Sequence, residues 1–155
     1  MRTYLVIVLL IAFSLLSGWY SYKKPQSPRP TPIYIKPTPQ HINADALSLL
    51  VNTWRINNNL KAFTKNEKLC SLAQIRLKTI QTNWSHIGFE TTIKQLGYDG
   101  KFGENLVREF IRSEDALDAW LTSSTHHSNL SNPLFTQTCI VCQQDYCAQE
   151  FSSDF

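Results

Sequence analysis

The first forty residues place the strongest limit on what this chain can fold into, because they cannot form part of a globular core. Tyr4 to Tyr22 form an apolar run without a charged residue, about 28 Å long if helical, which is enough to cross a thin bilayer. Six prolines follow between Pro25 and Pro39 and exclude a helix there. Only the residues after them can form a folded domain, and their number suits one domain.

We therefore divide the chain into an N-terminal membrane segment (1–22), a proline-rich linker (23–42) and a folded domain (43–155). Two interpretations of the first segment remain open, an uncleaved single-pass anchor and a cleaved signal peptide. The anchor is favoured because the positions around Leu15 to Gly18 match a signal-peptidase site poorly. The linker favours polyproline II and would act as a stiff spacer. The expected location is the membrane, with the domain outside the cytoplasm; a secreted or periplasmic protein is the alternative.

Charge is divided between this arm and the domain. Residues 1–40 hold five Lys or Arg and no acid, whereas residues 41–155 hold ten Lys or Arg and twelve Asp or Glu. The formal net charge of +3 therefore arises in the arm, and the domain is slightly acidic. No basic patch with interleaved aromatic residues occurs in the domain, so nucleic acid is not an expected partner. The expected partners are a membrane, through the N-terminal segment, and an extracytoplasmic ligand.

Hydrophobic spacing predicts several helices in the domain. Asn43 and Asn66 are suitable N-cap residues ahead of two stretches with apolar residues at helical spacing. A short third helix is expected to end at Gly97, and Ser113, followed by two acids, is a suitable start for a fourth. The predicted apolar faces of the first two helices are Leu47, Leu50, Val51 and Trp54, then Leu69, Leu72, Ala73, Leu77 and Ile80.

Strand-forming residues occupy three further stretches, 105–111, 137–142 and 146–152. The last two flank a short polar segment and are expected to form a hairpin. Helices on either side of a small antiparallel sheet give the α+β fold class, as a three-layer α-β-α sandwich.

Four cysteines follow a membrane-targeting segment, which indicates disulfides in an oxidising compartment. A hairpin that places Cys142 opposite Cys147 directs Cys139 to the other face of the sheet, because strand side chains alternate. This favours a Cys142–Cys147 bridge and leaves Cys139 to reach Cys70 on the second helix. A zinc knuckle built on the CxxC spacing of Cys139 and Cys142 is the weaker alternative, since a second CxxC is missing.

Four short motifs follow one another in a fixed order: WSH at Trp84 to His86, GEN at Gly103 to Asn105, SSTHHSNL at Ser123 to Leu130, and NPLF at Asn132 to Phe135. In order and spacing they resemble the CAP superfamily, the cysteine-rich secretory, antigen-5 and pathogenesis-related proteins, in its compact bacterial form. The resemblance covers about residues 45 to 151 and implies the same three-layer sandwich. Further residues that match its pattern are Trp120, His126, Asn129, Leu130, Gln149 and Phe151.

By this resemblance, His86, Glu104 and His126 match three members of the family's cleft tetrad. The fourth member, a Glu shortly after the tryptophan in many eukaryotic relatives, has no equivalent in residues 120–123, and Ser124 with Thr125 replaces the usual Pro and Gly. Glu104 is expected in a loop at the start of a strand. His126 is expected after the fourth helix and facing inward, which leaves its neighbour His127 to face solvent.

These residue types suggest metal-assisted chemistry or binding. Two neutral imidazoles, His86 and His126, can hold a divalent metal such as zinc, and Glu104 can then take a proton from bound water. Two protein ligands make only a weak site, so no tightly held cofactor is implied.

Three hypotheses about function follow. The first is an extracytoplasmic CAP-domain protein that binds a lipid, glycan, peptide or protein partner in its cleft. The second is a metal-assisted hydrolase acting on peptide or cell-envelope substrates. The third treats the His and Glu side chains as a purely structural hydrogen-bond network.

Overall fold

The structure, a computed structural model, describes residues 41–153; the expected membrane segment and all but the end of the linker lie outside the described residues. None of the helices in this range is both long and apolar enough to span a bilayer. The range forms five helices and four strands. Their order is α2 (Ala44–Asn57), β1 (Thr64–Lys65), α3 (Glu67–Thr82), α4 (Phe89–Gln95), β2 (Phe102–Val107), α5 (Ser113–Thr122), α6 (Ser124–Ser131), β3 (Gln137–Gln143) and β4 (Tyr146–Ser152).

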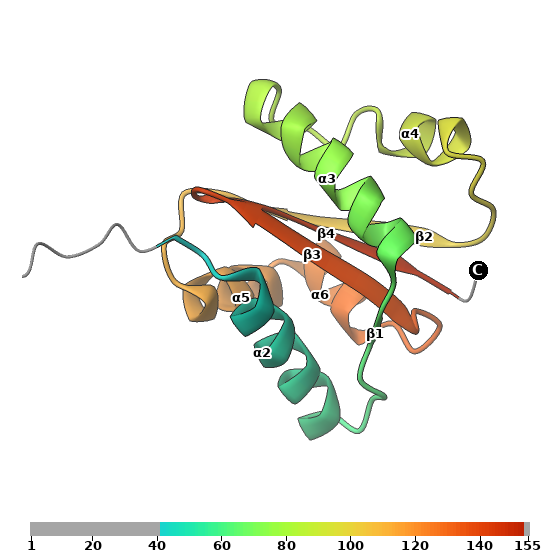
Figure 1. The fold of residues 1–155 in the computed structure, drawn as a ribbon. Coiled ribbons are helices and arrows are strands. Elements are labelled where there is room, and N and C mark those ends of the chain that lie inside the picture. Colours follow the sequence, from blue (N-terminus) through green and yellow to red (C-terminus); the bar gives the residue numbers. More distant parts are fainter. Residues whose placement is uncertain (1–40, 154–155) are drawn as a thin grey trace, which may run out of the picture. The chain divides into compact units, whose positions relative to one another are not determined.

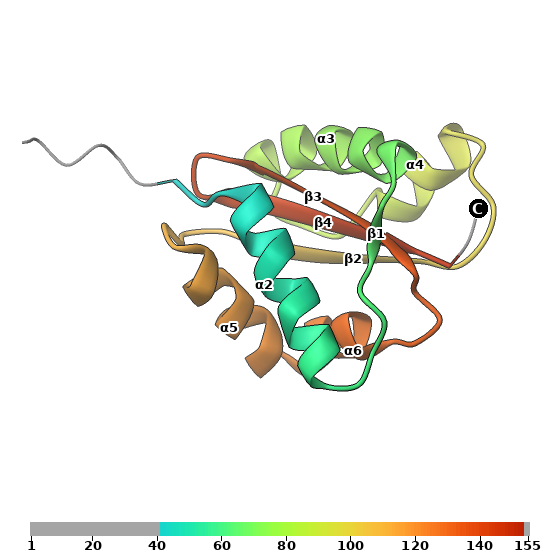
Figure 2. The same ribbon diagram turned by 60° about the horizontal axis from the view of Figure 1, so that its bottom comes forward.

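These elements form three layers (Figures 1 and 2). The sheet has the order β1-β3-β4-β2, with α3 and α4 over one face and α2, α5 and α6 over the other. The predicted α+β class and α-β-α layering are therefore confirmed. The sheet is mixed rather than wholly antiparallel, because β1 pairs in parallel with the start of β3. A strand of two residues carries no alternation pattern from which it could be predicted.

Both predicted N-caps are present. The Asn43 side chain accepts a hydrogen bond from the Ala46 backbone N–H, and the Asn66 side chain accepts from two N–H groups at the start of α3. The fourth helix differs in detail, since Arg112 occupies the cap position and Ser113 is its first residue. Ser113 Oγ instead donates to Asn43 O at 3.1 Å, which ties the start of α5 to the start of α2.

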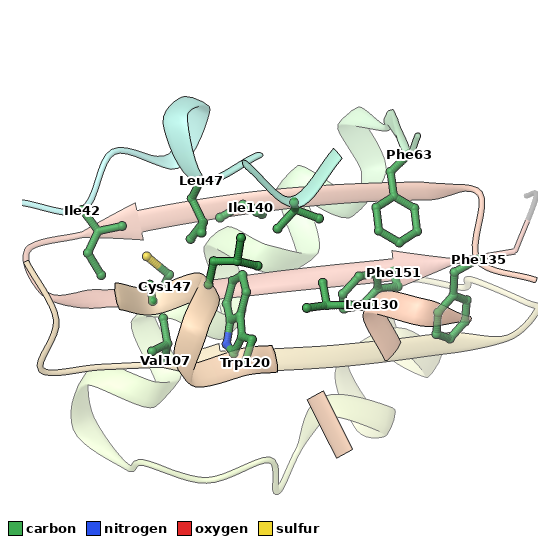
Figure 3. Close-up of a cluster of buried hydrophobic side chains, with 13 residues drawn as sticks. Ile42, Leu47, Phe63, Val107, Trp120, Leu130, Phe135, Ile140, Cys147 and Phe151 are labelled. Carbon is green, nitrogen blue, oxygen red and sulfur yellow. The ribbon is translucent and has the colours of Figure 1, made fainter. Parts of the chain in front are cut away.

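The main core lies between the sheet and the layer formed by α2, α5 and α6 (Figure 3). Trp120, Phe151 and Leu47 are fully buried there. Arg55 of α2 is buried at the edge of this core, with its guanidinium carbon 3.7 Å from the Phe63 ring centroid and its N–H groups donating to backbone carbonyls after α6. Arg55 therefore fastens α2 to the segment that leads into β3.

The hairpin has the predicted register, with Cys142 directly opposite Cys147. These two residues form one disulfide, and Cys139, on the face covered by α3, forms the other with Cys70. The CxxC zinc knuckle is thereby excluded, because both of its sulfurs belong to disulfides.

The first long strand begins and ends earlier than the stretch 105–111 from which it was predicted. β2 takes in Phe102 and Gly103 because it pairs with β4 from Ser152 back to Cys147. It ends at Val107, and Glu109 then adopts a left-handed backbone conformation with φ 68°. Pairing with β4, and not local residue preference, decides these limits.

Candidate functional site

Glu104 lies inside β2 rather than in the loop before it, and its side chain is 1 % exposed. Arg76 reaches it from α3: Arg76 Nε donates to Glu104 Oε2 at 2.6 Å, and Arg76 Nη2 donates to Oε1 at 3.2 Å. Arg76 is also fully buried. Both oxygens of the carboxylate are therefore held by one guanidinium in a fork geometry, which fixes the side chain in position.

The same arginine holds the loop that carries His86. Arg76 Nη2 donates to Ser85 O at 2.8 Å and Arg76 Nη1 donates to Ile87 O at 3.2 Å, on either side of His86. His86 Nδ1 lies 2.8 Å from Glu104 Oε1. Because an ionised carboxylate only accepts hydrogen bonds, His86 Nδ1–H donates in this contact, and the Nε2 lone pair is left for a ligand. The His86 side chain is 59 % exposed, so it forms the accessible surface above the buried pair.

His126 comes from the opposite side of β2. It lies after the fourth predicted helix, as expected, and within a further short helix, α6, which Ser123 separates from α5. Asn105 Nδ2 donates to His126 O at 3.2 Å, and the His126 and His86 ring centroids are 6.3 Å apart. Burial lowers the pKa of His126, and the neighbouring His86 lowers it further. His126 is therefore held as a neutral imidazole beside the exposed one.

His127 has a different environment. Its ring is 5.3 Å from the Trp54 ring, edge-on, on the side where α6 meets α2. Of the two adjacent imidazoles, His126 is thus the one that lies near His86.

Two residues of the motifs cover the free edge of β2. Trp120 Nε1 donates to Leu106 O at 3.1 Å, and Asn129 Nδ2 donates to Glu104 O at 3.2 Å. Asn129 Nδ2 also lies 2.9 Å from Asn105 Oδ1. These side chains satisfy backbone carbonyls that would otherwise be unpaired on an edge strand, and they fix α5 and α6 against the site.

Sequence reasoning missed two residues of the site, Arg76 and Glu150. Arg76 falls on the buried face of α3, between Ala73 and Leu77, so its helical position was a usable signal. Glu150 is directly opposite Glu104 in β4 and is completely buried. Neither oxygen of Glu150 has a hydrogen-bond partner among the described residues. Burial, followed by the Glu104 carboxylate, raises the pKa of Glu150 well above its ordinary value, so this side chain is a neutral acid.

A pocket of about 300 Å³ adjoins His126 at the end of β2. Its walls come from the loop before His86, from β2 and the residues after it, and from α5. The lining residues are Trp84, Leu106, Val107, Arg108, Glu109, Phe110, Ala119, Trp120, Ser123 and His126.

The side chains of the site give limited support for a bound metal ion. Within residues 41–153 no three His, Cys, Asp or Glu side chains are grouped closely enough to hold an ion. A tetrahedral ion bound by both imidazoles would bring their centroids to about 5 Å, so the observed 6.3 Å would have to shorten. The residues fit a weak, two-ligand site in which Glu104 would orient His86 from behind.

Comparison with known proteins decides the family. The family model described as CAP, cysteine-rich secretory protein family, matches residues 49–155, which is well over half of the chain. The chain belongs to the CAP family. The resemblance inferred from its motifs is thus confirmed, and His86, Glu104 and His126 all lie in the matched region of this CAP domain. A search of curated proteins found no match.

Solved structures show the same fold. A cysteine-rich secretory protein from Staphylococcus aureus matches with a TM-score of 0.67 at 19 % identity, over 72 % of this chain and 38 % of its own. An extracellular protein with an SCP domain from Bacillus anthracis matches with a TM-score of 0.65 at 20 % identity, over 72 % of this chain and 40 % of its own. An outer surface protein of Borrelia burgdorferi matches with a TM-score of 0.64 at 20 % identity, over 72 % of this chain and 92 % of its own. The chain spans about two fifths of the first two proteins. At these identities the likeness concerns the fold of the CAP domain.

Proposed function

We propose that this CAP domain works outside the cytoplasm as a ligand-binding domain, with the cleft formed by the pocket beside His126 and the adjacent His86 ring as its binding site. The proposal extends to a single-pass anchor formed by residues 1–22, which would hold the domain at a membrane surface. Two disulfides favour an oxidising compartment, and the names of the similar structures describe extracellular or outer-surface proteins.

The state of Glu104 carries the proposal for binding rather than catalysis. A general base must reach a water bound in the cleft, yet Glu104 is 1 % exposed and both of its oxygens accept hydrogen bonds from Arg76. Its remaining contact toward the surface is with His86. Glu104 is therefore placed to orient His86 as a hydrogen-bonding group for a ligand.

The cleft also has the composition of a recognition site. One exposed imidazole, one half-buried neutral imidazole and the adjoining pocket of about 300 Å³ lie together at the edge of the sheet. A concave apolar surface with a few convergent polar groups is typical of small-molecule and peptide sites.

Capture from cell-envelope extracts tests this function. Wild-type protein and a His126→Ala variant are immobilised and incubated with the extract, and bound molecules are identified by mass spectrometry. We expect the wild-type protein to bind a ligand that is recovered chemically intact, and we expect His126→Ala not to bind it. The matched control is His127→Ala, which alters the adjacent imidazole outside the cleft and should retain the ligand. Equal retention by all three proteins would place binding elsewhere.

A metal-assisted hydrolase is the second candidate, favoured by the proximity of two imidazoles and a carboxylate. This hypothesis predicts that zinc raises the melting temperature of the wild type but not that of His86→Ala or His126→Ala. It also predicts that the wild type cleaves envelope peptides in the presence of zinc and that Glu104→Gln abolishes this cleavage. Retention of an intact ligand with no zinc-dependent cleavage would favour binding.

Membrane fractionation tests the anchor. The full-length protein should remain in the membrane fraction at its unprocessed mass, with the domain open to protease added from outside. Release of a shortened soluble form would favour the signal peptide instead.

A further inference from the structure

The pocket beside His126 is lined by one permanent cation, Arg108, and by apolar side chains. We propose that it binds the free carboxyl terminus of a peptide whose last side chain is apolar. This inference rests on the proposed function and names the ligand class of the same cleft. Arg108 would bind the terminal carboxylate, and the accessible apolar side chains of the lining, Trp84, Phe110 and Ala119, would receive the last side chain.

Arg108 is oriented before any ligand arrives. Its guanidinium carbon lies 4.8 Å from the centre of the Trp84 ring, and Trp84 in turn contacts the Tyr146 ring at 6.0 Å. Stacking on an indole holds the flat face of the guanidinium and leaves N–H donors at its edge, the arrangement suited to a carboxylate.

The existing partner of Arg108 is weak. Arg108 Nε lies 3.3 Å from Glu109 Oε1, with the two side chains 39 % and 73 % exposed. An ion pair this exposed contributes little, so a ligand carboxylate can displace it.

Two other titratable groups line the pocket, His126 and Glu109, and of these His126 does not oppose an anion. His126 is part of the lining, and because burial and His86 lower its pKa it remains a neutral hydrogen-bonding group. Arg108 therefore sets the charge preference inside the pocket, and Glu109 is the acid that a ligand must displace.

Size favours a peptide end over a lipid. At about 300 Å³ the pocket is at the small end of ligand sites, enough for one side chain and a carboxylate. A long acyl chain needs a deeper channel. Trp120 also borders the pocket; it is fully buried and fixed by its bond to Leu106 O.

The backbone at the rim gives an independent indication. Glu109 has φ 68°, a left-handed conformation that costs energy for a residue with a side chain. Strain of this kind gathers at binding sites, and here it lies directly after Arg108, where β2 ends. The strand does not continue past this turn, and Glu109 and Phe110 both line the pocket.

A matched pair of ligands tests the proposal. The tetrapeptide Gly-Ser-Gly-Phe, fluorescein-labelled at its amino end, is prepared as the free acid and as the C-terminal amide. Fluorescence anisotropy then measures binding to the full-length protein in lipid nanodiscs. We expect the acid to bind at least about tenfold more tightly than the amide, because a charge-assisted bidentate contact is lost in the amide.

Variants locate the contact. Arg108→Gln should reduce binding of the acid to the level of the amide, and Arg108→Lys should restore part of it. Arg112→Gln removes an exposed arginine outside the pocket lining and should leave both affinities unchanged. Circular dichroism confirms that each variant is folded.

Each alternative outcome overturns the inference in a distinct way. Equal binding of acid and amide, or an unaffected Arg108→Gln, would exclude a carboxylate contact at Arg108. Binding of dodecanoate by calorimetry without peptide binding would make the ligand a fatty acid. If no peptide binds while the envelope capture still depends on His126, the proposed function stands and the peptide terminus is wrong; if neither is observed, both fail.

Discussion

Arg76 and Glu104 form an ion pair that is almost completely removed from solvent, with Arg76 Nε 2.6 Å from Glu104 Oε2 and side-chain exposures of 0 % and 1 %. This contact joins α3 to β2 and supports the loop that carries His86. The accessible part of the cleft thus depends on a buried charge pair that no ligand touches.

Removal of one member of this pair should strongly destabilise the domain. Arg76→Met leaves the Glu104 carboxylate buried without its partner, so we expect the free energy of unfolding to fall by about 3–5 kcal/mol in denaturant titrations. Lys65→Met, which breaks the exposed Lys65–Glu67 pair, should cost less than about 1 kcal/mol. Adding Glu104→Gln to Arg76→Met should recover part of the loss; a double variant no more stable than the single one would argue against an uncompensated charge.

Glu150 should make stability depend on pH. Its folded-state pKa is raised above the ordinary 4.5 by burial and by Glu104, so its contribution is complete below about pH 4.5 and is lost as the pH rises toward the folded-state pKa. Glu150→Gln keeps a neutral side chain at every pH. Unfolding measured from pH 4 to 8 should therefore show the variant gaining stability relative to wild type as pH rises. The exposed Glu90→Gln is the control, and a constant difference for Glu150→Gln would contradict the assignment.

Gly103 should not tolerate a side chain. A Cβ there would lie 2.9 Å from Phe135 Cε2 and 3.1 Å from Asn129 Oδ1, both on neighbouring segments. We expect Gly103→Ala to cost about 1–3 kcal/mol by overpacking, measured as a shift in the denaturation midpoint. Gly97→Asn provides the contrast, because no atom lies within 4 Å and Asn accepts its φ of +68°. Because Gly103 is not in the left-handed region, similar losses at both glycines would argue against crowding as the particular cause at Gly103.

The two disulfides should contribute unequally. Cys70 and Cys139 are separated by 69 residues, and Cys142 and Cys147 by 5. The entropy of the closed loop then predicts losses of about 4 kcal/mol for the Cys70→Ala, Cys139→Ala double variant and about 2 kcal/mol for the Cys142→Ala, Cys147→Ala one. Thermal and chemical unfolding of both variants measure the two losses of stability. A larger loss for the Cys142→Ala, Cys147→Ala variant would contradict the predicted order.

Local features of the sequence were sufficient for much of the architecture. Asn43 and Asn66 predict helix starts because a side-chain cap acts on the next few N–H groups alone. The pairing of Cys142 with Cys147 follows from the short hairpin, and the alternation of strand side chains then leaves Cys139 for Cys70. The order of the motifs, through the family resemblance that it carries, predicts that His86, Glu104 and His126 share one region.

Only the tertiary structure decided what those residues contact. Arg76 and Glu150 come from α3 and β4, far apart in sequence from each other, and they meet Glu104 because two layers pack together. The burial that holds Glu150 neutral is a property of the whole environment, so its charge state cannot be deduced from neighbouring residues. Likewise, the limits of β2 and the parallel pairing of β1 depend on partner strands. Short-range capping and alternation are written in the sequence, whereas long-range pairing, burial and electrostatics arise only when the layers assemble.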